Sequence, residues 1–191
     1  MTDNNQHVRR LLGIAGTFAS GKDTLAEWLE TKGFYHVSTS NMVRAGSKDK
    51  YGSTDRKHLH VYANETREAE GAGIFLDRAL MQAVDYDNVV ISGIRSIGEV
   101  EALKAAGGKL IFMDAPIEIR YKRAFSRGRD EADVSFDSFK ASEEKELHKP
   151  EELKTDQNIG AMKRHADIIL ENDDNIDSFY ADAAKALELD D

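Results

Sequence analysis

One short stretch decides the fold: Gly16-Thr17-Phe18-Ala19-Ser20-Gly21-Lys22-Asp23-Thr24. Its two glycines lie five positions apart, so the backbone between them can curl until successive N–H groups point inward at an anion. The apolar run before it, residues 11–15, has the length of a buried strand, and residues 24–32 after it have helical periodicity. Strand, glycine loop and helix together predict a loop that binds phosphate at the N-terminus of a helix.

We therefore assign residues 16–24 to nucleotide binding and expect Lys22 to reach the β and γ phosphates as a mobile positive charge. The position after this lysine commonly carries a hydroxyl that binds magnesium, but here it holds Asp23, and the hydroxyl follows as Thr24. Because Mg²⁺ prefers oxygen ligands, Asp23 and Thr24 are the predicted metal ligands and ATP with Mg²⁺ the predicted cofactor. An ordinary glycine turn before a surface helix is the alternative, and the flanking strand and helix argue against it.

Length and composition indicate a single globular domain over residues 1–191, with 40% hydrophobic residues. The net charge of −9 argues against a broad surface for nucleic acid. The chain has no cysteine, which excludes disulfides and thiol catalysis. A polar start over residues 1–7 and the lack of a long apolar run lead us to expect a cytoplasmic protein without a membrane partner. The oligomeric state cannot be read from the sequence.

Beyond the first helix, apolar strand patterns alternate with helical patterns. We expect four more strands, at residues 34–37, 88–94, 110–113 and 166–170. We expect helices at 38–45, 58–70, 74–84, 97–107, from Pro116 onward, at 138–149 and at 176–187, with a weaker helical signal near 159–162 and a polar mobile loop at 46–55. This alternation predicts an α/β three-layer sandwich around a five-stranded parallel sheet.

Four arginines stand out as candidate anion-binding residues. Arg44 lies one turn into the short helix that follows the second strand, and Arg95 comes directly after the strand at 88–94. Because the carboxyl ends of parallel strands face the ligand crevice, we expect Arg95 to lie near the phosphate loop. Arg123 and Arg127 are four apart and so share a helix face, where a phosphoryl group between them would relieve their repulsion.

Three of these arginines also have a plainer interpretation. Arg44 could be a solvated side chain on an exposed helix. Arg123 and Arg127 could form a solubility face that pairs with the acidic residues at 130–133. His58 and His60, two positions apart, would face different directions on a helix, so we interpret them as surface residues rather than a metal pair.

Several stretches resemble the nucleoside monophosphate kinase group of P-loop kinases, with related features in deoxynucleotide kinase-like proteins and dephospho-coenzyme A kinases. They are the phosphate loop, the segments 36–45, 71–80 and 92–95, Asp114-Ala115-Pro116 with Arg123 and Arg127, and residues 166–172, which are similar to the strand and asparagine near the adenine in such kinases.

The resemblance implies a P-loop NTPase fold with sheet order 2-3-1-4-5. It implies an ATP-dependent phosphotransferase that moves the γ-phosphate to a small phosphorylated acceptor, a nucleoside or deoxynucleoside monophosphate. By the same resemblance, a substrate-binding segment spans about 38–85 and a lid about 127–140. The acceptor would be bound by Ser40, Asn41, Arg44 and Arg95, and catalysis would depend on Lys22, Arg123 and Arg127.

Three positions depart from the pattern of this group. Asn41 and Ser92 stand where the group has aspartates, and Asp23 stands where the loop has a hydroxyl. We hypothesise that Asp23 supplies the acidic contact to hydrated magnesium that Ser92 cannot. Two alternatives stay open: a kinase with a hydroxyl acceptor, in which an acid such as Asp114 would assist, and a nucleotide-binding regulator without transfer activity.

Overall fold

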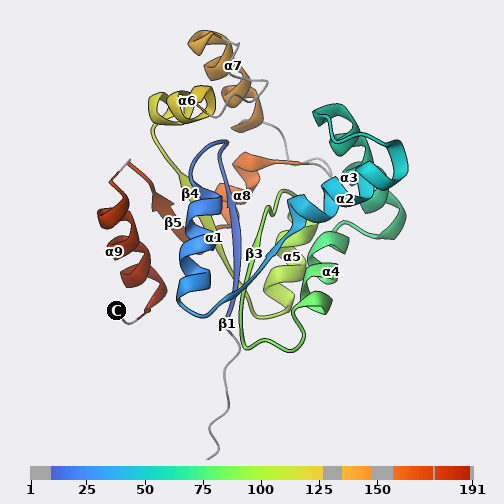
Figure 1. Ribbon diagram of the computed structural model, residues 1–191, viewed down its shortest axis with the longest axis horizontal. Helices are drawn as coiled ribbons and strands as arrows, with labels where there is room; N and C mark the ends of the chain where they lie inside the picture. The colour runs from blue at the N-terminus through green and yellow to red at the C-terminus, as the bar shows by residue number, and fades with distance from the viewer. Residues whose placement is uncertain (1–9, 127–134, 148–156, 174, 190–191) are drawn as a thin grey trace, which may run out of the picture.

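The computed structural model describes residues 10–126, 135–147, 157–173 and 175–189 (Figure 1). Its five strands form one sheet in which every pair is parallel, in the order β2-β3-β1-β4-β5. The strands are β1 (Arg10–Gly16), β2 (Tyr35–Ser38), β3 (Asn88–Ser92), β4 (Lys109–Asp114) and β5 (Ile168–Glu171). The predicted strands, their direction and their order are confirmed.

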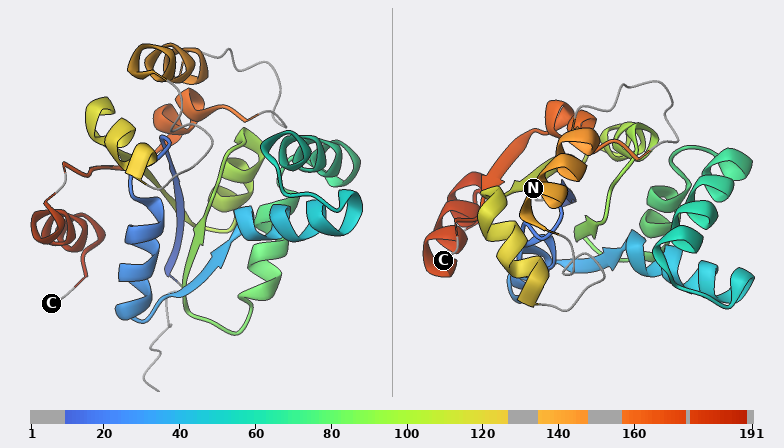
Figure 2. Two further views of the ribbon diagram at one scale, coloured as in Figure 1. Left: turned by 45° about the horizontal axis from the view of Figure 1, so that its top comes forward. Right: turned by 90° about the horizontal axis from the view of Figure 1, so that it is seen from above.

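Helices cover both faces of this sheet. They are α1 (Lys22–Thr31), α2 (Thr39–Tyr51), α3 (Arg56–Glu70), α4 (Ile74–Gln82), α5 (Ile97–Ala105), α6 (Ile117–Ser126), α7 (Phe136–Leu147), α8 (Ile159–His165) and α9 (Ile176–Leu187). Figure 1 shows α1 and α9 on one face and α4 and α5 on the other, with α2 and α3 beyond the β2 edge. Figure 2 shows α6 and α7 over the carboxyl ends of the strands. The three-layer sandwich is confirmed.

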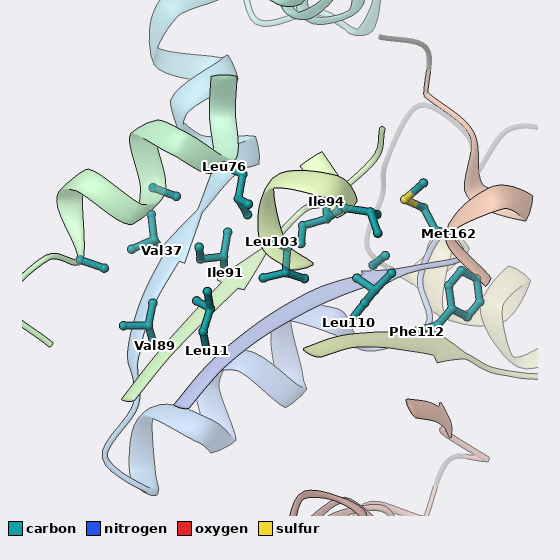
Figure 3. Packing of buried hydrophobic residues seen from close by; sticks show 14 of the residues in the cluster. Leu11, Val37, Leu76, Val89, Ile91, Ile94, Leu103, Leu110, Phe112 and Met162 are labelled. Carbon is teal, nitrogen blue, oxygen red and sulfur yellow. The ribbon is translucent and has the colours of Figure 1, made fainter. Parts of the chain in front are cut away.

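The hydrophobic core is divided by the sheet into two clusters. Side chains alternate along β1, so Leu11 and Ala15 belong to the cluster under α4 and α5, whereas Leu12 and Ile14 belong to the cluster under α1 and α9. Figure 3 shows the first cluster, in which Leu103 of α5 lies over the strands. β1 is central, with Gly13 opposite Ile91 of β3 and Leu110 of β4, and it therefore fixes the phosphate loop at the middle of the sheet edge.

The structure corrects the mobile loop that we expected at residues 46–55. Helix α2 continues to Tyr51 and ends at Gly52, whose φ of 67° is left-handed. Ser47 is buried and its hydroxyl donates to the carbonyl oxygen of Ser53 at 2.8 Å. Residues 46–51 thus belong to a helix on which Lys48, Asp49 and Lys50 are exposed, and irregular structure is confined to residues 52–55.

The predicted lid at about 127–140 is described only in part. Residues 135–140 contain the start of α7, and residues 127–134, with Arg127, lie outside the described residues. Among the helices that the structure describes, none has the length and apolar character needed to cross a membrane.

Candidate active site

The phosphate loop connects β1 to α1 and depends on its glycines. Gly16 and Gly21 have φ values of 150° and 97°. A Cβ on Gly16 would lie 2.2 Å from the carbonyl oxygen of Met113, and one on Gly21 would lie 2.4 Å from Nδ2 of Asn172. Helix α1 has no side-chain cap at its N-terminus, so its first amides are left for an anion.

Lys22 lies folded over this loop. Its Nζ donates to the carbonyl oxygens of Gly16 at 3.1 Å and Thr17 at 2.6 Å. Burial, together with the positive charge of Arg95, lowers the pKa of Lys22 to about 7, against the opposing effect of Asp23. An anion bound beside this ammonium would raise the pKa of Lys22 again.

A cavity of about 350 Å³, which we name the outer cavity, opens beside the loop. Its lining residues are Phe18, Ala19, Ser20, Gly21, Lys22, Asp23, Glu27, Glu30, His36, Ser38, Ser40, Asn41, Arg44, Ser92, Gly93 and Arg95. All four predicted acceptor residues, Ser40, Asn41, Arg44 and Arg95, thus line the same cavity as the phosphate loop. The grouping of these residues agrees with the sequence-based expectation, and their roles stay predictions.

A second hollow of about 190 Å³, the inner cavity, extends from the outer one between α2 and α3. Its lining residues are Phe18, Thr39, Ser40, Val43, Arg44, Arg56, Leu59, His60, Ala63, Arg67, Gly93, Arg95 and Gln157. The two cavities share Phe18, Ser40, Arg44, Gly93 and Arg95, which mark the passage between them.

Arg95 is positioned by the start of α5. The buried carboxylate of Glu99 accepts from the amides of Arg95 at 2.8 Å and Ser96 at 3.2 Å, while Ser96 caps the helix in return. Glu99 also binds the Arg67 guanidinium at 2.9 Å. The Arg95 side chain is open to the cavities, yet the protein around it lowers its pKa, mainly by desolvation.

The two predicted metal ligands differ in placement. The Asp23 side chain is exposed and lines the outer cavity, whereas Thr24 is half-buried and does not belong to that lining. Among the described residues there is no cluster of three His, Asp or Glu side chains that could bind a metal alone. Mg²⁺ in nucleotide sites usually takes one or two carboxylates together with phosphate and water oxygens, and the single carboxylate of Asp23 fits that mode.

Arg123 does not join Arg44 and Arg95. Its Nη2 donates to Oδ1 of Asn172 at 2.8 Å, and Asn172 in turn lies against Gly21. Neither Arg123 nor Asn172 lines the outer or the inner cavity. The structure thus places Arg123 beside the phosphate loop at Asn172, the residue that the family resemblance associates with adenine.

Two charged residues near the phosphate loop are occupied by structural contacts. Arg120, which lies on α6 with Arg123, is buried and pairs with the buried Glu143 of α7. Asp114 accepts from Thr17 at 3.0 Å and from Lys163 at 2.7 Å. These bonds, with one from the Ala115 amide, outweigh desolvation and lower the pKa of Asp114. Asp114 lines neither cavity, so the structure gives no support to Asp114 as a base for a hydroxyl acceptor.

Sequence reasoning missed several residues that line the cavities. His60 is half-buried and lines the inner cavity, so its interpretation as a surface residue is wrong. Arg67 is 3% exposed and lines the same cavity, although its position on the same helix face as Ala63 was a signal. His36 lines the outer cavity, where its Nε2 lies 2.8 Å from Oγ of Ser92. Its place near the carboxyl end of β2 could have indicated it.

Comparison with known proteins places this arrangement in a family. Residues 12–148 match the family model AAA_18, described as an AAA domain. The chain belongs to this AAA domain family. Within the family it resembles a UPF0200 protein of Pyrobaculum aerophilum, 33% identical over 139 residues that cover 72% of this chain and 77% of the relative. A UPF0200 protein of Sulfurisphaera tokodaii is 27% identical over 182 residues, covering 94% and 96%.

Solved structures with the same fold include kinases. TT1252 from Thermus thermophilus has a TM-score of 0.61 at 21% identity, covering 95% of this chain and 98% of its own. Shikimate kinase from Acinetobacter baumannii has a TM-score of 0.61 at 16% identity, covering 95% of both chains. Dephospho-CoA kinase from Campylobacter jejuni has 0.54 at 19% identity, covering 93% and 95%. This AAA domain protein therefore has the P-loop kinase fold, as the sequence motifs predicted.

Proposed function

We propose that this protein is an ATP-dependent phosphotransferase that transfers the γ-phosphoryl group to a small phosphorylated acceptor, with nucleoside monophosphates the first class to test. One observation carries the proposal: the phosphate loop lines a single cavity with Arg44 and Arg95. A polyphosphate and a second anion can therefore meet in one hollow. The kinase neighbours of the fold support the same reaction type.

The chain's own residues would act mainly by position and charge. The loop amides and Lys22 bind the β and γ phosphates, and Arg44 and Arg95 orient the acceptor in line with the γ-phosphorus. Arg123 and Arg127 would supply positive charge that offsets the negative charge on the oxygens of the transferred group. Asp23 and Thr24 would hold Mg²⁺, which screens the phosphate charges when it is bound. A phosphate acceptor is already ionised at neutral pH and needs no base from the protein.

A hydroxyl acceptor is the second candidate, and it is favoured by His36. This imidazole lines the outer cavity, and a neutral histidine is a suitable general base for an alcohol. The resemblance of residues 166–172 to dephospho-coenzyme A kinases points the same way.

Turnover with a defined acceptor panel tests the proposal. The full chain is incubated with ATP, Mg²⁺ and one acceptor at a time, either a nucleoside monophosphate or dephospho-coenzyme A, and mass spectrometry follows new phosphorylated products. A nucleoside diphosphate supports the phosphate acceptor, and a phosphorylated alcohol supports the second candidate. If no acceptor of the panel accelerates ATP consumption over the rate without acceptor, both of these acceptor classes are wrong and a nucleotide-binding regulator becomes the favoured function.

A further inference from the structure

The lining of the inner cavity is unusually rich in positive charge. Arg44, Arg56, Arg67 and Arg95 all contribute to it, and its described lining contains neither aspartate nor glutamate. A guanidinium carries five N–H donors and no acceptor. A ligand group in this cavity therefore meets donors from several directions.

Two carboxylates close to the cavity are already paired. Glu146 binds Arg56 at 3.3 Å. One oxygen of Glu99 binds Arg67, and the other accepts two backbone amides at the start of α5. Even so, Nη1 of Arg67 is buried without a hydrogen-bond partner. Burial lowers the pKa of His60, and the charges of Arg56 and Arg95 lower it further against the opposing effect of Glu146, so positive charge prevails at this part of the wall.

These properties suit an anionic group better than a nucleobase. A base edge offers both donors and acceptors, whereas the guanidiniums of this wall can only donate. The apolar part of the wall combines Phe18 with the aliphatic residues Val43, Leu59 and Ala63. The volume of about 190 Å³ is also below the roughly 300–1,000 Å³ of pockets that enclose drug-sized ligands. The inner cavity is the size of a compact group.

We propose that the acceptor carries a second oxyanion, a carboxylate or a phosphate, on the end that lies in the inner cavity. The inference rests on the proposed function, because it takes the reacting end of the acceptor to lie in the outer cavity. Arg44 and Arg95 line both cavities and would hold the middle of the molecule. Arg67 would attract the far end from the cavity wall. The favoured substrate class is then a short metabolite with an oxyanion group at each end.

Binding to a matched set of probes tests this without turnover. Isothermal titration calorimetry on the full chain compares 3-phosphoglycerate with glycerol 3-phosphate, which has a neutral hydroxymethyl in place of the carboxylate. Propane-1,3-diol bisphosphate and adenosine monophosphate complete the set. We expect the carboxylate or the second phosphate to tighten binding about tenfold or more over glycerol 3-phosphate, the range for charge-assisted hydrogen bonds. Whichever of the two probes gains more identifies the oxyanion.

Two variants place a competing carboxylate in the cavity. Leu59→Glu and His60→Glu change residues of the lining, and Val61→Glu makes the same kind of change on the solvent side of α3, where Val61 is 38% exposed. The ratio of affinities between the probes with two oxyanion groups and glycerol 3-phosphate should fall to about one in both cavity variants and persist in the control. Circular dichroism verifies that each variant is folded. If the cavity variants do not fold, the comparison of probes on the wild-type protein decides the test.

The inference is overturned if wild-type protein binds the probes with two oxyanion groups no more tightly than glycerol 3-phosphate, or if it binds none of the probes. It is also overturned if adenosine monophosphate binds more tightly than all of them, or if folded cavity variants keep the preference. These failures are distinct from failure of the proposed function. A nucleoside diphosphate product without selective binding of probes with two oxyanion groups removes only the inference. Selective binding without transfer to any acceptor removes only the kinase proposal.

Discussion

The outer and inner cavities meet at Arg44 and Arg95 but are built in different ways. The outer cavity takes much of its wall from one contiguous stretch, residues 18–23, and mixes Lys22 with the carboxylates of Asp23, Glu27 and Glu30. The inner cavity is assembled from α2, α3 and the connection after β3, and its charged lining is positive. A wall of both signs suits a polyphosphate that arrives with a cation, whereas a positive wall suits an anion alone. The two binding functions can therefore be perturbed separately.

The largest expected effect concerns the buried ion pairs that support the two cavities. Removal of one partner from a buried pair typically costs about 3–5 kcal/mol. Glu143→Ala leaves the buried Arg120 without its carboxylate partner, and Arg120 also donates to the Ala115 carbonyl oxygen close to the phosphate loop. Glu99→Ala leaves the buried Arg67 without its carboxylate partner at the inner cavity. We expect Glu99→Ala to be the more damaging, because Glu99 also accepts two backbone amides.

Urea denaturation measures the free energy of unfolding for both variants. The control is Glu70→Ala, since Glu70 forms an exposed pair with Arg78 that should contribute about 0–1 kcal/mol. Equal losses in all three variants would contradict the structural role of the two buried carboxylates.

Lys22→Ala should lower turnover through the outer cavity and leave the inner cavity unchanged. Removal of one group that stabilises transition-state charge costs about 10²–10³-fold in turnover. The far-UV circular dichroism should be unchanged, because the ammonium contacts only loop carbonyls. Lys185→Ala on α9 is the control, and an equal loss of activity there, or loss of helical signal in Lys22→Ala, would contradict the assignment.

Arg44→Ala should weaken acceptor binding more than ATP binding. Among the described residues Arg44 has no hydrogen-bond or ion-pair partner, so its loss should leave the fold intact. Charge-assisted hydrogen bonds are worth about 1.5–3 kcal/mol, and we expect the acceptor KM to rise about 10–150-fold. Steady-state kinetics with Arg78→Ala as control measures both constants. An equal rise in the KM for ATP would contradict the assignment of Arg44 to acceptor binding.

The smallest expected effect is a pH dependence confined to the outer cavity. Free Lys22 has a pKa of about 7, and a bound polyphosphate favours its protonated form, so ATP binding should be accompanied by proton uptake above that pH. The Kd for ATP should then rise with pH above 7, by at most about tenfold per unit. The arginines that line the inner cavity remain charged, and a non-titrating anion such as sulfate should bind there without this dependence.

Calorimetry between pH 7.5 and 9 in buffers of different ionisation enthalpy detects the proton. Lys22→Ala should abolish the uptake. A wild-type Kd for ATP that does not change over this range would show that Lys22 stays protonated in the free protein.

Local sequence was sufficient to predict the strands and the phosphate loop. It was insufficient where the structure depended on contacts with residues elsewhere in the chain. The polar residues 46–51 gave no sign that they continue α2, since the partner of the buried Ser47 hydroxyl is the carbonyl oxygen of Ser53, beyond the end of the helix. Arg120 and Arg123 lie on one helix, yet Arg120 is buried against Glu143 and Arg123 is held by Asn172. Periodicity carries no information about which distant carboxylate or amide a given arginine meets.

The sequence by itself determined the parallel sheet and the anion-binding loop, because both follow from contiguous residues: alternating apolar runs, and two glycines that precede a lysine. Only the tertiary structure decided the inner cavity. Its arginines come from α2, α3 and the start of α5, and the pairing of Arg67 with Glu99 spans 32 residues of chain. A charge acquires its partner and its solvation only when such segments pack, and for that reason the character of the inner cavity emerges with the fold.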